Sequence, residues 1–457
     1  MGGVSTSDDK VLGFKDVTIM AVTANFGIRW IPVAACLGAS AVFFWILGAL
    51  IFFLPLVVIA VQLSRKYPDE GGMYAWTTRA MGEKSGFMVA WLYWINTIFY
   101  YPAVLIFLAT NFAYFIGRPD LVNNHYYISI VVLIAFWLIT IISFYGLKAN
   151  KYLVDIGGIL GSFIPAIAII VLGFAAYFVS GKSATNFSAS SFIPHDNIFN
   201  NLSTLTIIMF AMAGIEIIPT FANSVKDAKK NLFYGLIVAS VILVGLYVLA
   251  TVALNLVASP DSIGSASGLM TAFEIIGKEF GWVWFPKLMA FLLTFAEFAA
   301  VSIWLLAPVI MFFKCTPKGI LPEWLHKTNK HGSPKNALIF MGVLVSIIVL
   351  LTNFLPSVDT MYQALILMAT VLYFIPYLYL VVSYIKLSNT KLKYIFGVLV
   401  FISTTLGIIF SFQPPADLQP MNDIVIYELE LILGPTIFIA IGALLYKFRK
   451  KESVGGE

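Results

Sequence analysis

Charged residues are scarce in this chain. Only 11% of its 457 residues are Asp, Glu, Lys or Arg, whereas 60% are hydrophobic. A soluble domain usually carries about 25% charged residues. Because so many apolar side chains cannot all be buried inside a core surrounded by water, the composition excludes an ordinary soluble domain. It predicts a chain that is surrounded largely by lipid.

Cysteine and the common catalytic motifs are also scarce. Cys36 and Cys315 are the only two cysteines, and no CxxC or CxxH pattern surrounds either of them. A disulfide framework and a cysteine metal site are therefore excluded. The sequence also has no P-loop, no GxSxG and no HExxH. We expect no enzymatic activity, no cofactor, no bound metal and no nucleic-acid partner.

Long apolar stretches are what the sequence has in abundance. Each is roughly 20 residues or longer, which is enough to cross a hydrocarbon layer of about 30 Å. The first is too long for the apolar part of a signal peptide, so we expect it to remain as a span. The sequence predicts an all-α polytopic membrane protein of about twelve transmembrane helices. The stretches are 17–39, 41–63, 86–116, 126–147, 153–180, 202–223, 232–257, 282–313, 336–356, 360–385, 394–413 and 425–446.

The basic residues divide unequally between the two sides of such a bundle. An even number of spans places both termini on one side, together with 23 of the 28 Lys and Arg residues; Arg118, Lys182 and Lys278 fall on the other side. The positive-inside rule then predicts cytoplasmic termini for a multi-pass protein of the plasma membrane, the inner membrane in a bacterium. The expected parts are a cytoplasmic N-terminus (1–16), a core (17–390), two further helices (391–446) and a basic tail (447–457).

Spans one and six share a six-residue pattern. Both Gly27 to Pro32 and Gly214 to Pro219 read Gly-Ile-charge-x-Ile-Pro, five spans apart. Proline removes a helical hydrogen bond and glycine adds backbone freedom, so each pattern predicts an interrupted helix. An odd offset reverses the second copy across the membrane, which is typical of an inverted-topology repeat, here about 17–180 and 202–385. The alternative is that each pattern only kinks its helix.

Both patterns carry a charge, which is rare inside a membrane. A bare carboxylate at the bilayer centre costs at least ~2.5–3.5 kcal/mol, so Glu216 must be paired, protonated or facing water. We expect a proton-linked gate here; the alternative is that Glu216 only binds the unwound backbone of span one. The side chain of Arg29 can adopt one of several arrangements. It can pair with Glu216 or with Glu297 of span eight, fork onto a substrate carboxylate, or extend to the outer aqueous vestibule. Gating thus involves Glu216, Arg29 and Glu297.

These segments resemble the amino acid/polyamine/organocation superfamily, and within it the bacterial glutamate–GABA and arginine–agmatine antiporters. The similarity covers about residues 12–445 and is best in the span-one break, the loop 65–76, the segment 214–227 and the stretch 319–334. The resemblance implies a LeuT-like five-plus-five inverted repeat with broken helices 1 and 6, plus two C-terminal helices. It also implies alternating access without cofactor chemistry. A homodimer is one assembly state that it leaves open.

The resemblance also implies a substrate site between the broken helices. Relatives have an aromatic gate where Phe210 lies and stack a ring on the substrate where Trp304 lies. The expected site consists of Asn25, Phe26, Gly27, Ile28, Arg29, Tyr100, Tyr101, Phe210, Ala213, Gly214, Glu216, Glu297, Trp304 and Tyr362. Such rings suit ammonium and guanidinium groups.

Three departures from the superfamily affect the expected chemistry. The usual Gly-Ser-Gly turn is replaced by Asn25-Phe26-Gly27, which can reshape the carboxylate pocket. Arg29 stands where polyamine carriers tend to have an acid. No lysine lies around Gly161 to Phe163, where sodium-independent relatives place one.

The function expected from the resemblance is transport by a secondary active carrier. It would move amino acids, or exchange an amino acid for its amine product, across the cell membrane. The alternative is a polyamine or other organic-cation permease with proton coupling. A channel would favour a symmetric oligomer with a filter sequence, so two broken helices in one chain argue against it.

Overall fold

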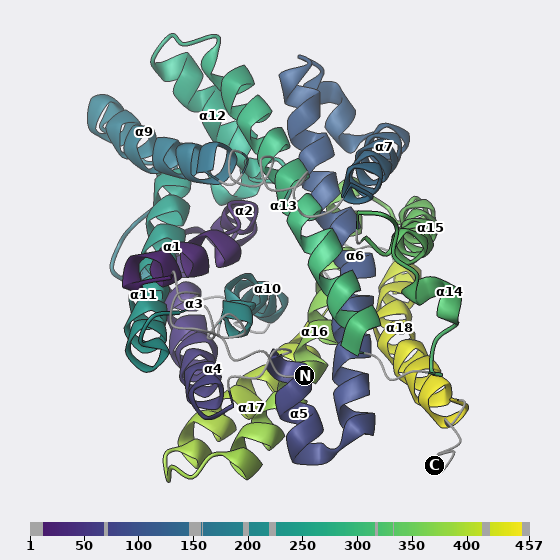
Figure 1. The fold of residues 1–457 in the computed structure, drawn as a ribbon. Coiled ribbons are helices and arrows are strands. Elements are labelled where there is room, and N and C mark those ends of the chain that lie inside the picture. Colours follow the sequence, from purple (N-terminus) through teal and green to yellow (C-terminus); the bar gives the residue numbers. More distant parts are fainter. Residues whose placement is uncertain are drawn as a thin grey trace, which may run out of the picture.

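The fold is almost entirely helical (Figure 1). The computed structural model describes residues 12–67, 72–145, 157, 159–194, 201–218, 225–315, 319–331, 333–413 and 421–449. Within these ranges the one strand-like contact is an isolated parallel bridge between Leu12 and Val225. The all-α class predicted from the sequence is therefore confirmed.

The helices follow one another along the chain. Two π-helical turns, η3 (Ala49–Phe53) and η5 (Ile159–Phe163), continue directly into helices. The helices are α1 (Phe14–Asn25), α2 (Trp30–Ala35), α3 (Ala41–Gly48), α4 (Leu54–Lys66), α5 (Gly72–Met81), α6 (Glu83–Phe115), α7 (His125–Ser143), α9 (Ile164–Ser180), α10 (Leu202–Met212), α11 (Ala228–Val257), α12 (Gly268–Glu279), α13 (Phe285–Cys315), α14 (Glu323–His326), α15 (Lys335–Thr352), α16 (Val358–Leu387), α17 (Lys393–Ser411) and α18 (Met421–Lys447).

Ten helical stretches of the described chain are long and apolar enough to cross a membrane. They coincide with ten of the twelve predicted runs. The two others, 17–39 and 202–223, contain the shorter helices α1, α2 and α10. Because these are the runs with the shared glycine–proline pattern, the shortening occurs where interruptions were expected.

Burial separates central helices from lipid-facing ones. In the most apolar window of α6, 94% of the residues are buried, and α6 packs extensively against α13 and α16 (Figure 1). In α15 and α17 the buried share is 33%. On α7, Ile130, Ile134 and Leu138 recur every four residues and are 57%, 57% and 49% exposed. Such an apolar stripe suits contact with lipid tails rather than with water.

Two amphipathic helices were not expected from the sequence. The segment 65–76, expected as a loop, instead ends α4 and begins α5; residues 68–71 lie outside the described part. Helix α12 buries Leu269, Phe273 and Ile276, whereas Lys278 is exposed. Both helices are too short to span a bilayer, so a search for long apolar runs passes over them.

Spans one and six are interrupted rather than only kinked. Helix α1 ends at Asn25 and α2 begins at Trp30. Helix α10 ends at Met212, and Gly214 follows with a φ of +112°, which glycine alone adopts readily. A 3₁₀ turn covers 215–218, and the rest of that predicted span, 219–223, lies outside the described residues. The backbone-break hypothesis is confirmed for the described parts of both spans.

Candidate functional site

The two interruptions lie against each other. A Cβ atom added to Gly214 would be 2.9 Å from the side-chain oxygen of Asn25. Tyr247 of α11 connects the two breaks, since its hydroxyl accepts from the Gly27 amide at 3.0 Å. The same hydroxyl lies within donating distance of the carbonyls of Asn25 (3.0 Å) and Ala211 (3.2 Å). Unwound backbone groups are thus satisfied by protein, as they must be away from water.

An ion pair joins the span-one break to α13. Arg29 Nη1 donates to Glu297 Oε2 at 2.9 Å, and Nη2 donates to the hydroxyl of Tyr100. The guanidinium also lies 4.9 Å from the ring centroid of Trp30. Arg29 and Glu297 are 8% and 2% exposed, and Arg29 is the only buried Lys or Arg in the described chain. Of the alternatives for Arg29, the pair with Glu297 is therefore confirmed as the arrangement in this structure.

Two of the three other placements of Arg29 are wrong for this conformation. Its burial rules out extension into an outer aqueous vestibule. It does not pair with Glu216, because α13 brings Glu297 to the span-one break, whereas the Glu216 carboxylate is bound by Tyr373 of α16 and by the Gly214 amide. An inverted repeat relates positions in two backbones. Which side chains meet depends on the other helices around them.

Glu216 is held by α16 and by its own span. Its Oε1 accepts from the Tyr373 hydroxyl at 2.7 Å, and its Oε2 accepts from the Gly214 amide at 3.1 Å. The Tyr377 hydroxyl is 3.2 Å from the same amide, and the hydroxyls of Tyr373 and Tyr93 are 3.2 Å apart. The alternative that Glu216 binds unwound backbone is correct in kind, but the backbone belongs to span six and not to span one.

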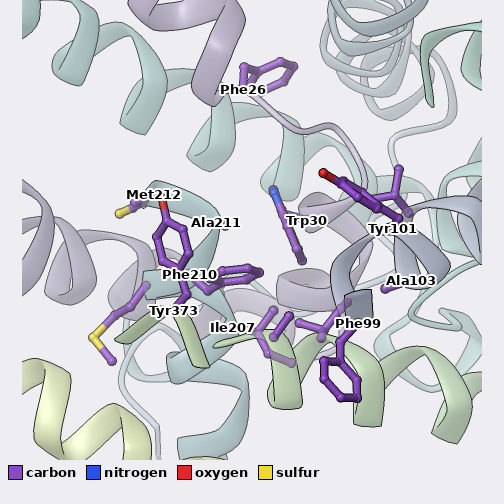
Figure 2. Close-up of a cluster of buried hydrophobic side chains, with 14 of the residues drawn as sticks. Phe26, Trp30, Phe99, Tyr101, Ala103, Ile207, Phe210, Ala211, Met212 and Tyr373 are labelled. Atoms are coloured by element: carbon purple, nitrogen blue, oxygen red, sulfur yellow. The ribbon is translucent and has the colours of Figure 1, made fainter. Parts of the chain in front are cut away.

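Phe210 lies between the two charged groups. Its ring packs edge-on against Trp30 (5.6 Å between centroids), Tyr373 (5.6 Å) and Tyr100 (6.0 Å). Figure 2 shows Phe210 with Trp30 on one side and Tyr373 on the other. A movement of this ring would therefore affect both the Arg29 contacts and the Glu216 contacts. Edge-to-face pairs of this kind are favourable beyond the area that they bury.

Phenyl rings occupy the contact between span five and the span-one break. Phe163 stacks on Phe26 with centroids 5.7 Å apart, and Phe26 also packs on Tyr247 at 5.2 Å. This is the region in which the superfamily resemblance would place a lysine or a sodium ion. In the described part of this contact an apolar stack of rings accompanies the absence of a lysine around Gly161 to Phe163.

The other expected residues contribute in different ways. Trp304 is half-buried, and its backbone carbonyl accepts from the Tyr101 hydroxyl at 2.6 Å. Tyr362 of α16 is fully buried, and its hydroxyl has no hydrogen-bond partner among the described residues. Ile28 is fully buried in the span-one break, and Ala213 extends the chain after α10. Ile28 and Ala213 thus belong to the breaks themselves, whereas the hydrogen bond of Trp304 is with Tyr101 of α6.

Sequence reasoning missed three tyrosines and a tryptophan. Tyr247, Tyr373 and Tyr377 hold the breaks, and Trp30 contacts Arg29. A weak signal existed for two of them, because Tyr373 and Tyr377 are one helical turn apart in an apolar span. With 21 tyrosines in the chain, that spacing alone does not distinguish them from packing residues.

Comparison with known proteins decides the family. Residues 12–452 match the family described as amino acid permease. The chain belongs to the amino acid permease family. The permease is 29% identical to an uncharacterized transporter of Legionella pneumophila, over 96% of this chain and 97% of the relative. It is 26% identical to a probable agmatine/putrescine antiporter of Lactococcus lactis (93% and 91% covered). It is 24% identical to a glutamate/gamma-aminobutyrate antiporter of the same species (92% and 87% covered).

Membership settles the class of protein but not the substrate. The permease is a multi-pass membrane transporter and not an enzyme, and relatives include an inner membrane transporter of Salmonella typhimurium at 23% identity. The two Lactococcus antiporters are named for chemically different compounds. One is named for two amines without a carboxylate, and the other for two compounds that have one. The chemistry of the site must therefore guide the choice.

Proposed function

We propose that this permease is a secondary active transporter that exchanges amino acids, or an amino acid for its amine product, by alternating access. The observation that carries the proposal is the meeting of two interrupted helices, one of which carries a buried ion pair to α13 at its break. Charged side chains cost free energy in an apolar interior and persist where they serve a pathway or a ligand. In the described chain the buried charges are Arg29, Glu216 and Glu297, and all three lie at or beside the breaks.

The proposed core is a five-plus-five inverted repeat with α17 and α18 added to it. In this arrangement α1, α2 and α10 would move against the larger group that contains α6 and α13. Three buried tyrosines, Tyr247, Tyr373 and Tyr377, would restrain this motion. Their hydroxyls form hydrogen bonds at both breaks in the present conformation, and these bonds would have to break before the helices move. Interrupted helices offer backbone and side-chain groups near the bilayer midplane, where transporters of this design bind substrate.

Exchange is the proposed mode for two reasons. Two relatives, 26% and 24% identical, are named as antiporters. The rings of Phe26 and Phe163 also stack where span one meets span five, and the sequence has no lysine around Phe163. Glu216 would act as the proton-linked gate, since its carboxylate is bound both by the Gly214 amide of the moving span six and by the Tyr373 hydroxyl of α16.

A second candidate is a polyamine or organic-cation permease. Glu297, Glu216 and the surrounding rings would suit a cation, and one relative is named as an agmatine/putrescine antiporter. The arrangement of Arg29 argues against it, because this guanidinium already neutralises Glu297 at 2.9 Å.

We also propose cytoplasmic termini. A depression of about 400 Å³ lies where α4 ends, α11 begins and α16 ends, and its lining includes Arg65, Lys66 and Lys229. Basic residues gathered at one end of a bundle mark the cytoplasmic side.

The test is counterflow in proteoliposomes. Uptake of labelled amino acids and amines is measured with empty vesicles and with vesicles that contain unlabelled substrate. Exchange predicts slow uptake into empty vesicles and uptake several-fold faster with internal substrate. Equal rates in both preparations, or an absolute need for sodium, would show that the exchange proposal is wrong.

A further inference from the structure

The ion pair also points to the charges that the substrate must carry. We infer that the Arg29–Glu297 pair is a resting form of the substrate site, which opens to accept a ligand that bears both a carboxylate and an ammonium group. The ligand carboxylate would bind the guanidinium of Arg29, and the ligand ammonium group would bind the carboxylate of Glu297. Amines that lack a carboxylate would then be poor ligands. This inference rests on the proposed function, because it assumes that substrate binds at the breaks.

The first support is the hydrogen bonding of Arg29. Its two terminal nitrogens are used by Glu297 and Tyr100, but Nε has no partner among the described residues although it is buried. The Tyr362 hydroxyl is also buried without a hydrogen-bond partner among the described residues. Buried polar groups are nearly always hydrogen-bonded. The unpartnered Nε of this guanidinium indicates a place where a ligand with acceptor oxygens completes the bonding.

The second support is that the usual backbone donor is occupied. The Gly27 amide, in the turn where the superfamily resemblance implies carboxylate binding, donates to Tyr247 at 3.0 Å. The Gly214 amide of the other break donates to Glu216 at 3.1 Å. These two backbone donors are thus already used, and Arg29 is the buried cation of the described chain. A guanidinium can bind a carboxylate through two parallel hydrogen bonds.

The third support is charge balance. Separating Arg29 from Glu297 leaves two opposite charges in an apolar interior, and each must find a new partner. A ligand with both charges supplies both partners. A dicationic amine such as putrescine can bind Glu297 but leaves Arg29 uncompensated and adds a second positive charge beside it. A dicarboxylate without nitrogen leaves Glu297 uncompensated instead. Only the first kind of ligand preserves neutrality at the site.

The test uses purified wild-type permease and needs no variant. Ligand binding is measured as the shift in melting temperature in detergent, with the twenty amino acids, gamma-aminobutyrate, glutarate, agmatine and putrescine as probes. The best ligand should contain both charges. Agmatine, putrescine and glutarate should bind at least about tenfold more weakly, since losing a charge-assisted hydrogen bond costs at least that much. Gamma-aminobutyrate has both charges and should bind better than putrescine, which has a similar length.

A paired variant tests the site itself. Arg29→Gln with Glu297→Gln removes both charges and leaves neither partner uncompensated. It should bring the affinities for the best amino acid and for putrescine to within about threefold of each other. The control is Arg118→Gln with Asp120→Asn, the exposed ion pair, which should keep the wild-type discrimination. If the first double variant does not fold, the wild-type ligand series decides alone.

The failures can be told apart. Agmatine or putrescine binding as tightly as the best amino acid would overturn the inference and leave a transporter with the proposed architecture. Wild-type discrimination in the folded Arg29→Gln/Glu297→Gln variant would overturn it as well. If no probe either binds or undergoes exchange, the proposed function is wrong, and the inference falls with it.

Discussion

Two ion pairs in this permease show how burial changes the energetic cost of losing one partner of a pair. Arg118 and Asp120 lie 2.7 Å apart in the connection after α6, and both side chains are 59% exposed. The guanidinium lowers the pKa of Asp120 from its ordinary value, but water screens the pair. Arg29 and Glu297 are 2.9 Å apart, with side chains 10% and 2% exposed. Loss of either partner there leaves a charge in a medium that hardly solvates it.

Stability measurements on the buried pair should be strongly non-additive. Arg29→Met or Glu297→Gln alone should cost about 3–5 kcal/mol, because one buried charge remains uncompensated. The double variant should be more stable than the worse single variant. Thermal unfolding in detergent measures all three, and Arg118→Met serves as the exposed control with a small shift. Additive losses in the double variant would contradict a direct pair.

At Glu216 a single hydroxyl can be removed with little change in shape. Tyr373→Phe deletes the donor to Oε1, and a hydrogen bond to a charged group is worth about 1.5–3 kcal/mol. We expect exchange to slow about tenfold or more and its dependence on pH to change, whereas Glu216→Gln should flatten that dependence. Tyr126→Phe, at a side chain that is 79% exposed, is the matched control. Wild-type pH–rate profiles in both Glu216→Gln and Tyr373→Phe would remove Glu216 from the gate.

At the scale of elements, the two interruptions depend on different local causes. In span one the helix stops at Asn25 and begins again at Trp30, and the Gly27 amide is held by Tyr247. In span six the turn requires Gly214 at φ +112°, a conformation in which an L-residue is strained. The second break is therefore the one that a single methyl group can disturb.

Gly214→Ala should abolish exchange. The backbone strain costs about 1–3 kcal/mol, and the new methyl group would lie 2.9 Å from the Asn25 oxygen, closer than carbon normally approaches. Gly245→Ala in α11 is the control, because an added Cβ there meets nothing within 4 Å. That change should leave exchange intact and raise stability by up to about 1 kcal/mol, since alanine favours a helix. Counterflow and melting temperature measure both variants; normal exchange by Gly214→Ala would show that the strained turn is dispensable.

At the scale of the whole molecule, orientation can be read from the two ends of one helix. Helix α11 runs from Ala228 to Val257, with Lys229 exposed at its start and Ser262 exposed just beyond its end. In a background without Cys36 and Cys315, we introduce Lys229→Cys or Ser262→Cys. On intact cells a membrane-impermeant maleimide should label only the cysteine at position 262, and permeabilised cells should show both. The opposite pattern would reverse the proposed orientation and with it the cytoplasmic termini.

Some properties of this permease follow from its sequence because they depend on neighbouring residues. Apolar runs of bilayer length predict the spans, and the two Gly-Ile-charge-x-Ile-Pro patterns predict where spans one and six break, since glycine and proline act on their own backbone. The amphipathic helices α5 and α12 escaped prediction because their burial depends on the spans beside them. The residue types in the site could likewise be foreseen, but not their partners.

The partners were decided by tertiary structure alone. Arg29 and Glu297 are 268 residues apart in sequence, and Glu216 and Tyr373 are 157 apart. Both acids lie inside predicted spans, so the sequence allows either of them to pair with Arg29. Which of them does so depends on how α13 and α16 approach the breaks. The role of Tyr247 is likewise set by packing. The sequence does not distinguish it from the other tyrosines, and its hydroxyl reaches the span-one break only because α11 packs beside α1. Local preferences act over a few residues, whereas pairing of buried charges is set by packing between helices that are distant in the chain.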